Sequence, residues 1–94
     1  MATAFVRHRV ADHAEWRQVY DDFAAVRAAG GVIDQAVFRS REDPNDLLVM
    51  HRFRTLSEAE AFIESSELRD AMDRAGVQGT PRIELFEETD RPPH

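Results

Sequence analysis

The segment Phe5–Gly31, FVRHRVADHAEWRQVYDDFAAVRAAGG, decides the fold of this 94-residue chain. It begins with a short stretch in which apolar and polar residues alternate, as they do in a half-buried strand. A longer stretch with apolar residues at helical spacing follows, and two glycines end it. The sequence therefore predicts a strand followed by a long amphipathic helix, which packs on the sheet that contains this strand.

Both ends of the predicted helix are marked in the sequence. Asp12 can cap the N-terminus, and Glu15 completes a capping-box pattern with Asp in the place of Ser or Thr. Gly30 and Gly31 supply a stop in the left-handed conformation. The apolar stripe between these signals consists of Trp16, Val19, Tyr20, Phe23 and Val26. We expect one helix over Asp12–Ala29, with this stripe facing the sheet.

The remainder of the chain predicts three more strands and a second helical region. Turn-forming residues in Arg41–Asp46, REDPND, join two of these strands into a hairpin. Thr55 and Glu58 form a capping box at the start of the second helical region, which Ser65 and Ser66 divide into two pieces. The predicted strands are Ala4–Val10, Val32–Ser40, Leu47–Phe53 and Pro81–Glu88, with a loop at Val77–Thr80 and a frayed tail at Arg91–His94.

This β-α-β-β-α-β order predicts an α+β, ferredoxin-like sandwich. Right-handed crossovers give a four-stranded antiparallel sheet of order 4-1-3-2 with both helical regions on one face. Residues 1–94 are expected to form a single domain. The other sheet face carries Phe and Val beside arginines, and no segment remains to cover it. An uncovered, partly apolar face on so small a domain predicts a homodimer that forms through the sheet face.

Composition excludes several classes of function. The formal net charge of −6 argues against nucleic acid or an anionic membrane as a partner. The chain has no cysteine, so disulfides and thiolate chemistry are excluded. It also lacks an apolar run of membrane-spanning length, a glycine-rich phosphate loop, a nucleophile elbow and an RNA-binding aromatic motif. We expect a cytoplasmic protein.

His8 and His51 are the main candidates for chemistry. Both lie in the middle of strands that the predicted order makes neighbours, and alternation places His8 on the helix-facing side with Val6 and Val10. The face of His51 stays open, because a register shift of one residue inverts it. Imidazole titrates near neutral pH, so the pair fits a general base or a grip on a substrate hydroxyl or carbonyl. The alternative is two buried histidines bonded to carboxylates or backbone.

Four further residues are candidates for substrate binding. Trp16 and Tyr20 lie four apart on the helix face that meets the sheet, where they form either an aromatic wall for a planar ligand or part of the core. Phe62 and Met72, from the second helical region, are expected to line the same cavity. No metal site is predicted, since two histidines without a third ligand are too few for zinc.

Four segments together resemble the dimeric α/β-barrel superfamily. They are RHRVADHAEWRQVYDDF, REDPNDLLVMHRF, SEAEAFIESSELRDAMDRAGV and GTPRIELFEETD, and they span almost the whole chain. Within this superfamily they look similar to the antibiotic-biosynthesis-monooxygenase-like proteins, many of which are labelled cyclases. Members pair two four-stranded sheets into a barrel and keep a ligand cavity between each sheet and its own helices. The resemblance therefore implies a homodimer with a hydrophobic small-molecule ligand.

The resemblance also suggests a reaction class. The superfamily includes cofactor-independent quinone-forming oxygenases, haem-degrading enzymes, polyketide cyclases and isomerases. Haem-degrading members carry a haem-ligating histidine in the second helical region, where this chain has Met72. The polyketide-oxidising members surround a phenol with Asn, Trp, Tyr and Arg, whereas Trp16 and Tyr20 lie on the first helix here.

The resulting expectation is an enzyme without a cofactor that oxygenates, cyclises or isomerises a hydrophobic aromatic or polyketide-like substrate. His8, together with His51, would serve as the base. The alternative is a non-catalytic ligand-binding or stress-associated homodimer.

Overall fold

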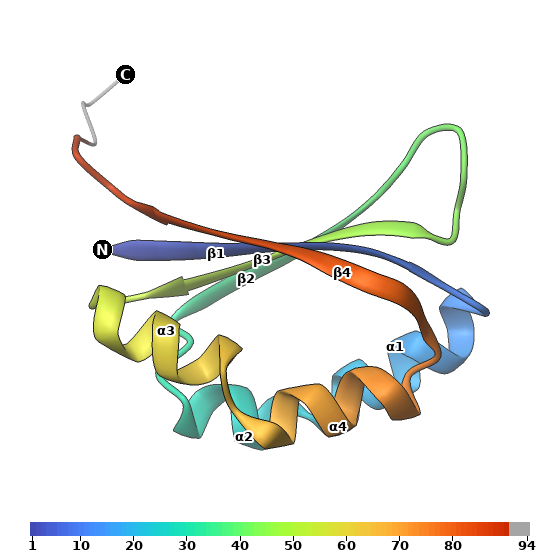
Figure 1. The fold of residues 1–94 in the computed structure, drawn as a ribbon, viewed down its shortest axis with the longest axis horizontal. Helices are drawn as coiled ribbons and strands as arrows, with labels where there is room; N and C mark the ends of the chain where they lie inside the picture. The colour runs from blue at the N-terminus through green and yellow to red at the C-terminus, as the bar shows by residue number, and fades with distance from the viewer. Residues whose placement is uncertain (91–94) are drawn as a thin grey trace.

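An antiparallel sheet with helices on one face forms the body of the molecule (Figure 1). The computed structural model describes residues 1–90; the frayed tail predicted at 91–94 lies outside the described residues. The strands are β1 (Ala2–Val10), β2 (Asp34–Arg39), β3 (Asp46–Phe53) and β4 (Val77–Glu87). The helices are α1 (His13–Asp22), α2 (Ala24–Ala29), α3 (Leu56–Ile63) and α4 (Ser66–Arg74). None of the helices within residues 1–90 has the length and apolar character needed to cross a membrane.

The sheet has the order β2-β3-β1-β4, which is the predicted order 4-1-3-2 read from the other edge. All neighbouring strands within it are antiparallel. The α+β, ferredoxin-like fold predicted from the sequence is therefore confirmed. β1 and β3 occupy the centre of the sheet, so residues from these two strands make up most of its buried face.

The predicted caps hold the helices at their N-termini. The Asp12 carboxylate accepts hydrogen bonds from the backbone N–H groups of Ala14 and Glu15, at 2.8 and 3.2 Å. The Thr55 hydroxyl oxygen accepts a bond from the Glu58 N–H at 3.1 Å. These bonds satisfy N–H groups that have no partner inside the helix, and they fix where α1 and α3 begin.

The first helical region is divided, whereas the sequence predicted one helix over 12–29. α1 ends at Asp22 and α2 begins at Ala24, with Phe23 between them. The Phe23 N–H donates to the Val19 and Tyr20 carbonyl oxygens, at 3.1 and 3.2 Å. The Arg27 guanidinium also donates to the Tyr20 carbonyl. A side chain that inserts into the hydrogen-bond ladder in this way bends a helix, which explains the break.

The last strand starts earlier than the sequence predicted. Residues 77–80, expected to form a loop, belong to β4, where Gln78 pairs with Arg9. The register then shifts, because the next pair is Arg7 with Arg82: a step of two residues along β1 corresponds to a step of four residues along β4. His8 is the one β1 residue between those pairs, so the bulge in β4 lies opposite it. Gly79, with a φ of 68°, supplies the left-handed backbone that this irregularity needs.

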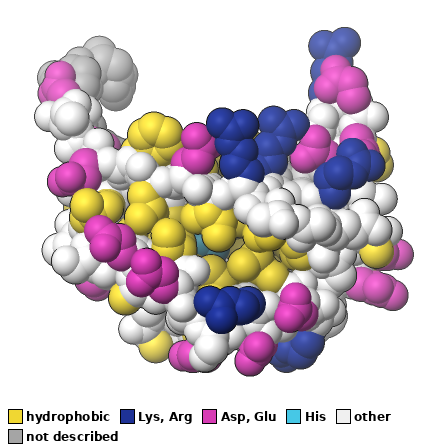
Figure 2. Space-filling model, in the orientation of Figure 1, with side chains coloured by type: hydrophobic (Ala, Val, Ile, Leu, Met, Phe, Trp, Pro, Cys, Tyr) yellow, Lys and Arg dark blue, Asp and Glu magenta, His cyan; other side chains and the backbone are white. Residues whose placement is uncertain are grey.

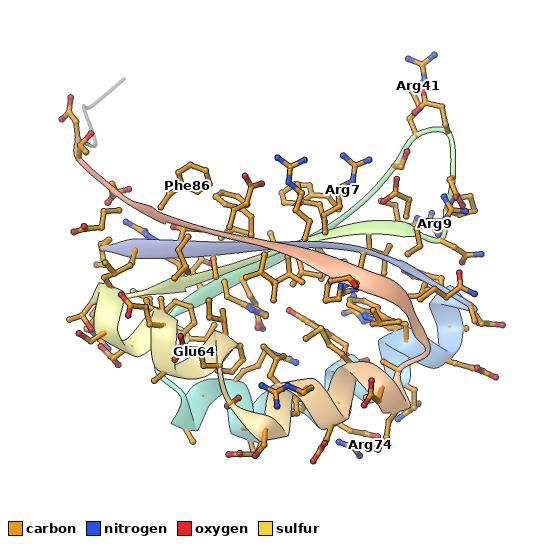
Figure 3. The ribbon with its side chains drawn as sticks, viewed as in Figure 1. Arg7, Arg9, Arg41, Glu64, Arg74 and Phe86 are labelled. Carbon is orange, nitrogen blue, oxygen red and sulfur yellow. The ribbon has the colours of Figure 1, made fainter. Side chains whose placement is uncertain are left out.

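The sheet face away from the helices is open. Figure 3 shows Phe86 and Arg7 projecting from this side. Phe38 and Phe86 are about half exposed, at 51% and 54%. The two arginines of β1 on this face, Arg7 and Arg9, pair with Asp46 and Asp43 of the same chain. Their charges are thus compensated within the chain, while the apolar rings remain uncovered in it.

We expect the core to depend strongly on Phe53, which is fully buried at the end of β3 and packs against the Phe62 ring at 5.5 Å. Phe53→Ala should lower the free energy of unfolding by about 3–5 kcal/mol, because it leaves a cavity. Phe53→Leu should lose about 1 kcal/mol. Urea denaturation followed by circular dichroism measures both values. Equal losses for the two variants would contradict the cavity argument.

Candidate functional site

The structure places His8 and His51 on the same, helix-facing side of the sheet. In the β1–β3 register Ala4 lies opposite His51, and His8 lies opposite Leu47. Ala4 and Leu47 are fully buried, so the two histidines share a face with core residues. His8 and His51 are only 7% and 4% exposed. The question that the sequence left open, which face His51 occupies, is thereby answered.

The imidazole nitrogens of both histidines have no hydrogen-bond partner within residues 1–90. The alternative of histidines bonded to carboxylates or backbone is therefore not what the described structure shows. Burial lowers the pKa of His8 to about 4, against a smaller opposing effect of Asp46. Burial also lowers the pKa of His51 to about 4, and the positive charge of Arg27 adds to this effect. Both imidazoles are consequently neutral at pH 7.

The histidines line a pocket between the sheet and helices α1, α2 and α4. The cavity volume of the pocket is about 50 Å³, and the larger empty space of about 440 Å³ around it includes open solvent. Figure 2 shows a hollow ringed by hydrophobic side chains, with a histidine visible at its bottom. The lining residues are Val6, His8, Trp16, Val19, Tyr20, Phe23, Arg27, Val49, His51, Leu68, Ala71, Met72 and Ala75. An apolar pocket with a few inward polar groups is the usual form of a small-molecule site.

Aromatic rings form one wall of the pocket. The Trp16 and Tyr20 rings stack with centroids 4.8 Å apart, as their spacing on α1 allows. The Tyr20 ring lies nearly parallel to the His51 ring at 6.2 Å, and the Trp16 ring lies 5.9 Å from that of His8. The two aromatic residues predicted on the first helix thus contact both histidines. They give the pocket an aromatic wall next to both imidazoles.

The other two predicted binding residues occupy different positions. Met72 is half-buried and belongs to the pocket lining. Phe62 does not belong to that lining; its ring meets the His51 ring edge-on at 5.4 Å and an angle of 84°. Phe62 therefore holds the orientation of His51 through packing.

Arg27 is a pocket residue that the sequence reasoning missed. It is only 4% exposed, and its guanidinium lies over the Tyr20 ring, 3.8 Å from the centroid. Its Nε donates to Gln35 Oε1 at 2.7 Å. The available signal was spacing: Arg27 continues the stripe of Trp16, Tyr20 and Phe23 at helical intervals, so its side chain had to point toward the sheet.

These groups define what the site can do chemically. Two neutral imidazoles can each accept a proton, and one buried cation can stabilise negative charge. Within residues 1–90 no group of three His, Asp or Glu side chains is placed to hold a metal ion. Acid–base chemistry on an apolar, flat ligand is therefore what the geometry suits.

Solved structures share this fold over almost their whole length. SnoaB from Streptomyces nogalater, described as a cofactor-independent oxygenase, is 18% identical, with a TM-score of 0.77 over 99% of this chain and 97% of that chain. A conserved protein from Methanosarcina mazei Go1 is 15% identical, with a TM-score of 0.74 over 95% and 94% of the two chains. Rv0793 from Mycobacterium tuberculosis is 13% identical, with a TM-score of 0.72 over 96% of each. At these identities the likeness concerns the fold.

The sequence itself settles the family. A comparison with curated protein sequences finds no match. The family model for antibiotic biosynthesis monooxygenase, however, matches residues 1–74, which include β1, β3 and every residue of the pocket lining except Ala75. The chain belongs to the antibiotic biosynthesis monooxygenase family.

Proposed function

We propose that this protein is a cofactor-independent oxygenase acting on a hydrophobic aromatic or polyketide-like substrate. One observation carries the proposal: two neutral imidazoles without hydrogen-bond partners within residues 1–90 line one apolar pocket. Buried nitrogens without hydrogen-bond partners lower the stability of the fold. A substrate hydroxyl or acidic C–H would supply the missing partner. Membership of the monooxygenase family and the fold shared with SnoaB support the same reaction class.

His8 is the better candidate for the base. The nearby Asp46 carboxylate raises the pKa of His8, whereas the Arg27 charge lowers that of His51. His8 therefore accepts a proton more easily than His51 does. The negative charge left on the substrate after proton transfer balances the positive charge on the imidazole. We assign to His51 the role of holding a substrate hydroxyl or carbonyl by a hydrogen bond. Cyclisation or isomerisation would use the same first proton transfer.

The proposed reaction takes place at an acidic carbon next to an aromatic carbonyl or phenol system. His8 removes one proton, and the resulting carbanion is oxidised by dioxygen. One oxygen atom stays on carbon as a carbonyl, and the other leaves as water with the two hydrogens of the original methylene. The substrate supplies the electrons, so the balance requires no other reductant.

Flat aromatic surfaces would hold the substrate in place. Trp16 and Tyr20 offer stacking faces, Met72 offers an adaptable apolar contact, and Phe62 supports His51 from behind. The pocket is small, with a cavity volume of about 50 Å³, so a substrate with several rings would have to displace lining side chains to enter fully.

We also propose that two copies associate through the open face of the sheet. Phe38 and Phe86 are about half exposed there, beside the partly buried Phe5, Leu48 and Met50. A contiguous apolar face of this kind is covered in most proteins of this size. A cytoplasmic location and the absence of a nucleic-acid partner remain predictions from the sequence.

Replacing the proposed base should abolish turnover. With dithranol (1,8-dihydroxyanthrone) and dioxygen as the test reaction, His8→Gln should lower kcat by at least ~100-fold, because it removes general base catalysis. His51→Gln should lower it by ~10-fold. Quinone absorbance and oxygen uptake measure the rate, and His13→Gln, outside the pocket, should match wild type. Full turnover by His8→Gln would refute the role of His8, and wild-type binding without turnover would favour a non-catalytic ligand-binding homodimer.

The neutral state of the buried histidines predicts how stability depends on pH. In the unfolded chain each histidine has a pKa near 6.5, against about 4 in the folded chain, so only the unfolded state takes up protons between these values. Stability should therefore fall as the pH drops from 6.5 toward 4, by about 1.4 kcal/mol per pH unit for each histidine. Urea midpoints of wild type and His51→Gln give the slopes. An equal slope in the two proteins would contradict the burial of a neutral His51, with His13→Gln as control.

The association through the sheet face predicts a particle of twice the chain mass of 10.8 kDa. Light scattering after size exclusion at ~50 μM should give this value for wild type. The double variant Phe38→Glu/Phe86→Glu should be monomeric, because it places like charges on the apolar face. Ile33→Glu, at an exposed apolar residue beside α2, is the control. A monomeric wild type would exclude this arrangement.

A further inference from the structure

Arg27 is a buried cation that no carboxylate neutralises within residues 1–90. The ion pairs of the described residues join Arg7, Arg9, Arg17, Arg52 and Arg82 to acidic partners, and Arg27 takes part in none of them. Those five arginines keep between 14% and 73% of their side-chain surface accessible, whereas Arg27 as a residue is 4% exposed. Charged side chains are almost never buried without a counter-charge, because their desolvation is costly.

Neutral oxygens and one ring hold the Arg27 guanidinium in place. Nε donates to Gln35 Oε1 at 2.7 Å, Nη1 donates to the Tyr20 carbonyl, and the guanidinium plane lies over the Tyr20 ring. The same Gln35 oxygen also accepts a bond from the Tyr20 hydroxyl at 3.3 Å. Among the described residues the guanidinium bonds are those of Nε and Nη1, and Nη2 is not one of the fully buried nitrogens without a partner. The side chain is thus fixed at one edge and retains donors for a further acceptor.

The surroundings of Arg27 compensate its charge only in part. Asp21 is the carboxylate whose charge acts on Arg27, and Asp21 is itself paired with Arg17 at 3.1 Å on the exposed side of α1. Burial is the main cause of a lowered pKa for Arg27, although the residue stays protonated in proteins. Arg27 also lines the pocket that His8 and His51 share, and on its other side it borders the hollow that Gln35 lines.

We propose that Arg27 binds an ionised oxygen of the substrate, and that the ligand is a planar aromatic molecule carrying a carboxylate or an ionised phenol. This inference rests on the proposed function, because it concerns the same pocket. The anion supplies a counter-charge, while the aromatic body packs in the apolar pocket beside Trp16 and Tyr20. Gln35 acts as a positioning residue: its neutral amide orients the guanidinium without cancelling its charge.

Naphthalene ligands provide the test, with calorimetric Kd values as the readout. Wild type should bind 2-naphthoate and 2,4-dinitro-1-naphtholate, both ionised at pH 7, at least ~10-fold more tightly than neutral 2-naphthamide. The two ions separate a carboxylate from a phenolate as the preferred oxygen. The indole N–H signal of Trp16, the only tryptophan, should shift in NMR spectra when the ligand enters the pocket.

Two variants make the inference falsifiable. Arg27→Gln should reduce the ratio of the Kd for 2-naphthamide to the Kd for the anions to about 1, with Arg69→Gln, an exposed arginine of α4 outside the pocket lining, as the control. Gln35→Glu should have the same effect without removing Arg27, because it places a carboxylate next to Arg27 Nε. This variant provides the test if Arg27→Gln does not fold. A preference that persists in Gln35→Glu, or a wild type that binds 2-naphthamide equally well, would overturn the inference.

The binding test of Arg27 can be read independently of the turnover test of His8. Anion preference in a protein whose His8→Gln variant keeps full activity would refute the proposed base and leave the role of Arg27 intact. Loss of turnover in His8→Gln without any anion preference in wild type would do the reverse.

Discussion

The pairing of β1 with β3 is the constraint on which the molecule depends. In an antiparallel pair the side chains alternate strictly, so a slip of one residue would move every buried side chain of a strand to the other face. The pairing of Val6 with Val49, both buried, ties the register to the hydrophobic core. That same register brings His8 and His51 to the helix side. The burial of ordinary apolar residues thereby determines where the chemistry is located.

The polar groups of the pocket oppose the stability that this core provides. Two imidazoles without hydrogen-bond partners in the part of the chain that the structure describes, and a cation without an ion pair there, occupy positions where apolar side chains would be more favourable. Proteins keep such arrangements where a ligand, rather than the fold, completes them. The site is therefore a place where the requirements of folding and those of binding differ, within a fold that this family uses widely.

Local signals in the sequence were sufficient for most of the architecture. Asp12, Thr55 and the turn at 41–46 act through neighbours in sequence, so helix starts and the hairpin followed from them. The break at Phe23 could not be predicted, because it depends on a contact between the Arg27 side chain and a backbone carbonyl about two turns away. The start of β4 was missed because its glycine and polar residues resemble a loop until β1 is placed beside them.

Site residues whose position depends on nearby sequence could be predicted, whereas those whose position depends on distant contacts could not. His8 followed from strand alternation alone, whereas the face of His51 required the register between two strands. Phe62 followed the apolar periodicity but lies behind the pocket, since periodicity gives the buried side of a helix and not what it touches. Arg27 was overlooked because its charge suggested an exposed position, although its spacing placed it on the buried stripe.

The irregular course of β4 has a consequence for which surfaces of the sheet are open to association. β4 is an edge strand, and open edges invite uncontrolled strand pairing and aggregation. Pro81 offers no N–H to an incoming strand, the bulge interrupts the straight edge, and the Arg82–Glu84 ion pair adds charge beside it. At the opposite edge β2 is only six residues long. Both edges are thereby protected, which leaves the broad face of the sheet as the surface where contact between copies is self-limiting.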